Sequence, residues 1–176
     1  FIPFWDTRRI LEATEPTVWL LDEFGQAPAA VQASFAPWFL AREVNGRRLP
    51  DHVTVIAMTN RRQDRSGVQG ILEFVKSRFI TIVEMEANLD DFCKNAIDKD
   101  FAIETIAYVR NFPDQLCDPH PTSDMTNSPN PRTWEAVSTL VKLNLPRALQ
   151  AEAFSGAVGP GAGLQFMGFL GVMASM

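Results

Sequence analysis

The 176-residue chain contains few of the residues that mark disulfide-stabilised or metal-binding proteins. It has only two cysteines, Cys93 and Cys117, which are too few for a disulfide framework in a chain of this length. Their spacing matches no zinc pattern, so we expect both to be reduced thiols that pack as small hydrophobic residues. The two histidines, His52 and His120, have no partner pattern, and we assign them no role.

Long apolar runs and excess positive charge are also missing. The longest weakly polar run, 164–176, is shorter than the roughly 20 residues that cross a bilayer. The N-terminus lacks the basic and then apolar order of a signal peptide. A net charge of −5 argues against a general nucleic-acid coat. We therefore expect a cytoplasmic protein with no membrane partner, for which nucleic acid is an unlikely ligand.

The apolar residues form short runs that alternate with helical patterns in the first half of the chain. These patterns predict strands over 17–21, 52–59 and 79–85, with helices over 6–13, 28–41 and 68–78 before and between them. Pro37 predicts a kink or a break in the second helix, and Asn45-Gly46 predicts a hairpin. The alternation of strand and helix is typical of an α/β layer.

The second half shows only helical patterns. A helix capped by Asn88 or Asp90 is expected first, then one over 101–112 and a polar loop over 118–130. Further helices are expected to begin at three prolines: Pro131, Pro146 and Pro160. We therefore predict two domains, a partial α/β domain over 1–86 and an all-helical domain over 87–176.

Polar residues follow the first two predicted strands. The first strand ends in Asp22 and Glu23, and the second ends at Asn60. Two carboxylates at a sheet edge suit Mg²⁺ and the activation of a water, and the amide of an asparagine suits orienting that water. Alternatively, the carboxylates cap a turn and Asn60 is an ordinary turn residue.

Two arginines occupy helix ends. Arg78 follows the helix predicted over 68–78, where the helix dipole favours a surface cation. Arg132 lies in the first turn of the helix that begins at Pro131, where the dipole disfavours it. A solvated surface position is the alternative for both.

Taken in order, these residues resemble the AAA+ ATPases, and within them the MoxR-like group. The resemblance covers about residues 16–169. The run VWLLDE resembles the Walker B strand, MTN the end of the sensor-1 strand, KSRF the arginine finger and NPRTW the sensor-2 arginine. The stretch DRSGV at 64–68 and the tail AVGPGAGLQFMGFL resemble less general signatures of the group.

The resemblance implies the C-terminal part of a P-loop AAA+ core followed by a helical lid, with ATP and Mg²⁺ as cofactors. Asp22 would hold Mg²⁺, Glu23 would polarise the attacking water, and Asn60 would orient that water and contact the nucleotide. Arg78 would reach the nucleotide of a neighbouring subunit, and Arg132 would act from the lid. The implied hydrolase is an ATP-dependent remodelling or assembly chaperone that works as a homo-oligomeric ring, most often of six subunits, on a protein substrate that the sequence does not name.

The chain departs from this family in one respect. A phosphate loop needs G-x-x-x-x-G-K-[ST], and the nearest run, 156–161, is followed by Ala162-Gly163, so we interpret it as a corner between helices. We expect the phosphate loop to lie before Phe1. The chain alone should then bind ATP poorly, and it should expose an apolar face where the missing central strand of the sheet belongs.

Two alternative interpretations remain. One is a non-catalytic oligomerisation or scaffold module that keeps the AAA+ fold. The other is an unrelated α/β domain with a helical tail, in which Asp22, Glu23 and Asn60 would lie apart. The hairpin also leaves a choice, since Arg47 and Arg48 either contact a partner polypeptide or form a solvated turn.

Overall fold

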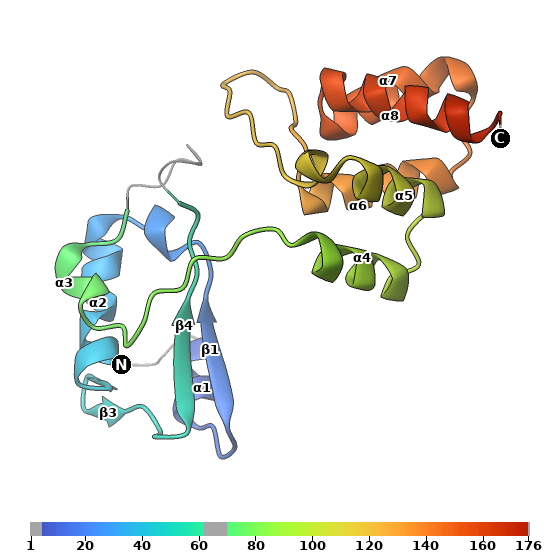
Figure 1. The fold of residues 1–176 in the computed structure, drawn as a ribbon. Coiled ribbons are helices and arrows are strands. Elements are labelled where there is room, and N and C mark those ends of the chain that lie inside the picture. Colours follow the sequence, from blue (N-terminus) through green and yellow to red (C-terminus); the bar gives the residue numbers. More distant parts are fainter. Residues whose placement is uncertain (1–4, 62–69, 176) are drawn as a thin grey trace. The chain divides into compact units, whose positions relative to one another are not determined.

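The computed structural model describes residues 5–61 and 70–175 of the chain. The chain divides into two compact units, Phe1–Val83 and Glu84–Met176. Figure 1 shows a small sheet with helices in the first unit and only helices in the second. The sequence pattern had placed the change from mixed to all-helical structure at residue 86.

The first unit contains a two-stranded parallel sheet with helices. Strands β1 (Thr17–Leu21) and β4 (Val53–Ala57) pair in register, with Thr17 opposite Val53 and Leu21 opposite Ala57. The other elements are α1 (Trp5–Leu11), a 3₁₀ turn η1 (Phe24–Gln26), α2 (Ala29–Leu40), β2 (Glu43–Val44), β3 (Arg47–Arg48) and α3 (Glu73–Lys76). This is a partial α/β arrangement, as the sequence predicted.

Two local predictions for this unit have different outcomes. The hairpin is confirmed: β2 and β3 pair antiparallel, and Asn45 (φ 51°) and Gly46 (φ 72°) both adopt the left-handed conformation that a tight two-residue turn requires. Of the kink or break predicted at Pro37, the break is wrong, because α2 continues through Pro37 and the Ala41 amide donates to the Pro37 carbonyl at 2.9 Å. The turn after Pro37 therefore keeps its helical bonding.

The two faces of the sheet differ in their cover. One face packs against α1 and α2, through a cluster made of buried Trp38, Leu49 and Val53 with partly buried neighbours such as Trp19 and Phe35. On the other face, Val18, Leu20 and Ile56 are between 43 and 56% exposed. This second face of the sheet is therefore apolar and partly exposed.

The prediction of a strand over 79–85 is wrong. Residues 79–88 have no regular secondary structure, and Ile80, Ile82 and Met85 are exposed. A strand forms only where a neighbour supplies pairing N–H and C=O groups. In the described residues, β1 and β4 pair with each other, and no strand lies beside this segment. Apolar residues of high strand propensity are therefore not enough to form a strand here.

The helix predicted over 68–78 is also shorter than expected. In the described part of this range, only α3 is helical. The cause is the buried side chain of Gln32 on α2. Its Nε2 donates to the carbonyls of Ala27 and Gly70, both at 2.9 Å, and its Oε1 accepts the Leu72 N–H at 3.0 Å. These bonds attach Gly70 and Leu72 to α2 outside the helix, and α3 begins only at Glu73. The 64–68 signature, with Asp64 and Arg65, lies outside the described residues.

The second unit contains all the helices that the sequence predicted. They are α4 (Leu89–Asp98), α5 (Ile103–Asn111), α6 (Pro131–Lys142), α7 (Arg147–Val158) and α8 (Pro160–Met173), with a 3₁₀ turn η3 (Pro113–Leu116) after α5. Asn88, and not Asp90, caps α4 by accepting the Asp91 N–H at 3.0 Å. In the parts of the chain that the structure describes, no helix has the length and apolar character needed to cross a membrane.

An aromatic core holds this unit together. Tyr108, Trp134, Phe154 and Phe166 are at most 1% exposed, and their rings contact one another with centroids 5.0–5.8 Å apart. The corner between α7 and α8 is formed by Gly159 at φ 90°, which agrees with the predicted helix corner.

The two cysteines differ. Both are free thiols, as expected, but only Cys93 is buried. The expectation that Cys117 packs as a hydrophobic residue is wrong, because Cys117 follows η3 in an extended, exposed segment.

Candidate functional site

The paired strands bring the predicted acidic and amide residues to one edge of the sheet. Asp22 and Glu23 follow β1 directly, and Asn60 comes three residues after β4. Backbone bonds continue past the strand ends: the Met58 N–H donates to the Leu21 carbonyl at 2.8 Å, and the Phe24 N–H donates to the Met58 carbonyl at 2.9 Å. The two strand ends are therefore fixed next to each other where the polar side chains begin.

Glu23 has an unusual backbone conformation. Its φ of 53° and ψ of 30° are left-handed, which is uncommon for a residue other than glycine. The Glu23 N–H donates to Asp22 Oδ1 at 2.9 Å, and the next residue, Phe24, is buried. Such conformations cost about 1–3 kcal/mol and cluster at functional sites. The turn thus presents the Glu23 side chain from a strained position directly after the strand.

Two amide side chains meet the Glu23 carboxylate. Asn60 Nδ2 lies 3.4 Å from Oε1 and 3.3 Å from Oε2, and Gln26 Nε2 donates to Oε2 at 2.5 Å. No lysine or arginine pairs with Glu23 in the described part of the chain. The carboxylate is therefore positioned by neutral donors and keeps acceptor capacity for a water.

The donors at this edge suit a magnesium ion that keeps most of its waters. Asp22 is exposed, and among the described residues its Oδ1 accepts only the neighbouring backbone N–H. Mg²⁺ is usually held by one or two carboxylates together with waters and substrate phosphates. Within residues 5–61 and 70–175, no group of three or more His, Cys, Asp or Glu residues is arranged to hold a metal. The carboxylates here therefore fit a magnesium site completed by waters and phosphates, and not a site built of protein ligands alone.

Arg78 belongs to the same unit but does not join this contact. It follows α3, its backbone N–H donates to the Val75 carbonyl at 3.0 Å, and its side chain is exposed. Its guanidinium has no hydrogen bond or ion pair with the described residues, whereas nearby Lys76 pairs with Glu73 at 2.5 Å. Arg78 is thus an available cation whose segment is attached to α2 through Gln32.

Arg132 lies in the other unit. It occupies the first turn of α6, where Asn130 caps the helix by accepting the N–H groups of Arg132 and Thr133 at 3.0 and 3.1 Å. The Arg132 side chain is exposed and makes no hydrogen bond or ion pair with the described residues. The structure therefore brings together three of the five predicted residues: Asp22, Glu23 and Asn60.

Sequence reasoning missed two glutamines. Gln26 contacts Glu23 from three residues along the chain, a spacing that carries no distinctive signal. Gln32 is the single long polar residue in the otherwise apolar run of α2, and this isolated position in the pattern was the available signal. Both glutamines act by orienting other groups.

Comparison with known protein families, with characterised proteins and with solved structures found no match to this chain.

Proposed function

We propose that the chain carries the metal- and water-binding part of an ATP-hydrolysing site of the MoxR-like AAA+ type. The contact of Asn60 with Glu23, at the adjacent ends of two paired parallel strands, supports this proposal most strongly. The order of the motifs along the sequence supports it further. The parent protein would use ATP hydrolysis to remodel or assemble a protein substrate.

The residues have separate tasks in this proposal. Glu23 accepts a proton from the attacking water, while Asn60 and Gln26 hold the carboxylate in place and Asn60 orients the water. Asp22 would hold Mg²⁺ mostly through water, and ATP with Mg²⁺ supplies the phosphoryl group. Phosphoryl transfer depends mainly on positioning and charge stabilisation, so a small set of oriented polar groups is sufficient chemistry for the protein.

The two arginines require a larger assembly. Arg78 would neutralise charge at the site of a neighbouring subunit, which is consistent with its exposed guanidinium. Arg132 would act from the helical unit on the nucleotide. A trans-acting arginine contributes about 10³–10⁵ in rate in GTPases. The proposal therefore includes a homo-oligomer.

A scaffold function is the second candidate. It is favoured by the sequence, which contains no phosphate loop, and by the exposed apolar face of Val18, Leu20 and Ile56, which suits association. The unrelated α/β domain required Asp22, Glu23 and Asn60 to lie apart, and it loses support because Glu23 and Asn60 are in contact.

The deciding experiment measures Mg²⁺-dependent ATP turnover for the 176-residue chain and for the same chain extended by the residues that its reading frame encodes before Phe1. We expect little turnover from the first and clear turnover from the second. Glu23→Gln should lower the turnover about 10²–10⁴-fold, the range for loss of a general base. Glu15→Gln, an exposed change outside the site, is the matched control. An extended oligomer that binds no nucleotide, or a start codon directly before Phe1, would favour the scaffold.

Mixed oligomers test the role of Arg78. Glu23→Gln subunits retain Arg78, and Arg78→Ala subunits retain Glu23, so each supplies what the other lacks. If Arg78 acts on a neighbour, mixing the two inactive variants should restore part of the turnover. Absence of any restoration in mixed oligomers would remove the trans role.

A further inference from the structure

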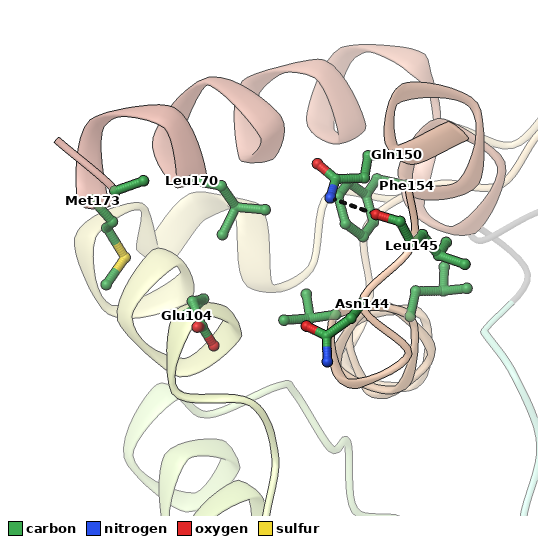
Figure 2. A pocket seen from close by; sticks show the side chains of 10 residues that line it. Glu104, Asn144, Leu145, Gln150, Phe154, Leu170 and Met173 are labelled. Carbon is green, nitrogen blue, oxygen red and sulfur yellow. Dashed lines mark hydrogen bonds between the residues drawn. The ribbon is translucent and has the colours of Figure 1, made fainter. Parts of the chain in front are cut away.

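The second unit contains a cavity of about 350 Å³ that the proposed ATPase site does not use. It lies among α5, α6, α7 and α8, and Figure 2 shows its lining side chains. The apolar part of the lining includes Leu140, Phe154, Leu170 and Met173. This volume is within the range of small ligand pockets, which combine an apolar lining with a few placed polar groups.

One of those polar groups is a carboxylate without a partner. Glu104, in the first turn of α5, is half-buried and makes no hydrogen bond or ion pair with the described residues. The lysine of α6, Lys142, is engaged with the carboxylate and carbonyl oxygens of Asp100. A partly buried carboxylate favours the approach of a cation, because a pair restores part of the lost solvation.

The remaining polar groups also present oxygen atoms. Gln150 Nε2 donates to the Leu145 carbonyl at 2.9 Å, and its Oε1 accepts no hydrogen bond from the described residues. Asn144 Nδ2 is directed to the Lys142 carbonyl at 3.5 Å, and Figure 2 shows Asn144 and Glu104 on one side of the cavity with Gln150 on the other. Ammonium and guanidinium groups donate only, so they match the Glu104 carboxylate and the amide oxygens, whereas the negative charge of Glu104 repels an anion.

The surface around the cavity favours a polypeptide over a small free amine. Ile103, Leu143 and Val172 are 61–64% exposed, and each is next in sequence to a lining residue. These exposed apolar side chains of the unit offer contact area to a polypeptide, and a small ligand inside the cavity would not use it. The unit also has 12 acidic and 6 basic residues over 84–176, a net charge of −6, which attracts a basic partner.

We propose that this cavity binds a lysine side chain of a partner polypeptide that carries apolar residues beside that lysine. The aliphatic stem lies against Leu140, Leu170 and Met173, and the ammonium group pairs with Glu104. Long cationic side chains bury their stems in this way while the charged end finds acceptors. This inference does not depend on the ATPase proposal.

The test is a titration of the chain with a short capped amphipathic peptide that contains one lysine, and with the same peptide carrying norleucine in its place. Fluorescence polarisation gives the affinity, and the NMR signal of the Met173 methyl group reports the location. We expect the lysine peptide to shift the Met173 signal and the norleucine peptide to bind about tenfold more weakly. A free alkyl amine, n-hexylamine, should bind more weakly than the lysine peptide.

Variants of the chain distinguish an effect of the Glu104 carboxylate on binding from effects of net charge and of unfolding. Glu104→Gln should weaken the lysine peptide about tenfold, and Glu152→Gln, an exposed residue of α7 outside the cavity, should not change it. Ala174→Phe, which adds bulk at the cavity wall without removing a core side chain, should block binding in a folded chain. Equal binding of both peptides, equal binding by Glu104→Gln and the native chain, or n-hexylamine binding as tightly as the peptide would overturn the proposal.

Discussion

The buried hydroxyl group of Tyr108 has no hydrogen-bond partner among the described residues, and this predicts how removing the hydroxyl changes the stability of the chain. The side chain is 0% exposed, and its oxygen has no hydrogen bond in the described part of the chain. Its ring contacts those of Phe112 and Trp134 at centroid distances of 4.9 and 5.0 Å. Tyr108→Phe keeps these ring contacts and removes the hydroxyl. A buried unsatisfied donor costs about 1–3 kcal/mol, so we expect the variant to be more stable by that amount at neutral pH.

The difference in folding stability between Tyr108→Phe and the native chain should grow at alkaline pH. Burial raises the pKa of Tyr108 to about 12, against an ordinary value of 10.0. Above pH 10 the unfolded chain releases the phenolic proton while the folded chain keeps it, so folding stability is lost as the pH rises towards 12. Two pKa units correspond to at most about 3 kcal/mol. Tyr108→Phe has no such proton and escapes this loss.

The assay is urea unfolding of both proteins, followed by tryptophan fluorescence at pH 7, 9, 10.5 and 11.5. Because Tyr108 is the single tyrosine of the chain, absorbance near 295 nm follows its ionisation directly. The reasoning is refuted if Tyr108→Phe is less stable at pH 7, or if the folded protein ionises its tyrosine near pH 10. Either result would mean that the hydroxyl is hydrogen-bonded or solvated.

Three further predictions concern backbone contacts and the exposed sheet. Gly163→Ala should destabilise the chain by about 1–3 kcal/mol in thermal unfolding, because a Cβ there would lie 2.4 Å from the backbone of α7. Gly168→Ala, with open space around it, should instead be neutral or stabilising by up to about 1 kcal/mol; equal effects would contradict the close contact. Gln32→Leu should lower stability by about 1–3 kcal/mol and speed amide exchange over 70–72, and unchanged exchange would show that other contacts hold that segment. Leu20→Lys should reduce concentration-dependent association in light scattering without unfolding the chain, since that side chain is exposed; unchanged association would place the contact elsewhere.

The sequence predicted the helical unit well because its signals are local. Asn88 and Asn130 cap their helices through side chains three residues or fewer from the N–H groups they satisfy. Pro131 and Pro160 start helices, where a missing N–H removes no bond. Each of these preferences acts within one turn and needs no information about the rest of the fold.

The segment 79–85 shows the limit of this approach. Its apolar residues have the propensity of a strand, but a strand also needs a neighbour, and pairing is decided by residues far away in sequence. The same limit explains Gln32, whose bonds to Gly70 and Leu72 span 38 and 40 positions. Asp22, Glu23 and Asn60 were predictable because the ends of paired parallel strands meet at one edge regardless of these details. The positions of Arg78 and Arg132 relative to that edge depend on the assembly and on the arrangement of the two units.

The exposed sheet face bears directly on the geometry of the proposed site. β1 is apolar on both faces, which is typical of strands covered on both sides, yet only the Trp19 face is covered by α1 and α2. Asn60 Nδ2 lies 3.3–3.4 Å from the Glu23 carboxylate oxygens, longer than the roughly 2.7–3.2 Å usual for N–H···O hydrogen bonds. Catalytic hydrogen bonds are often long in the free protein and shorten in the working complex. Since β1 and β4 carry both residues, a partner that covers Val18 and Ile56 would restrain both strand ends together. We therefore expect that a partner covering this face of the sheet also shortens the distance between the Glu23 carboxylate and Asn60 Nδ2.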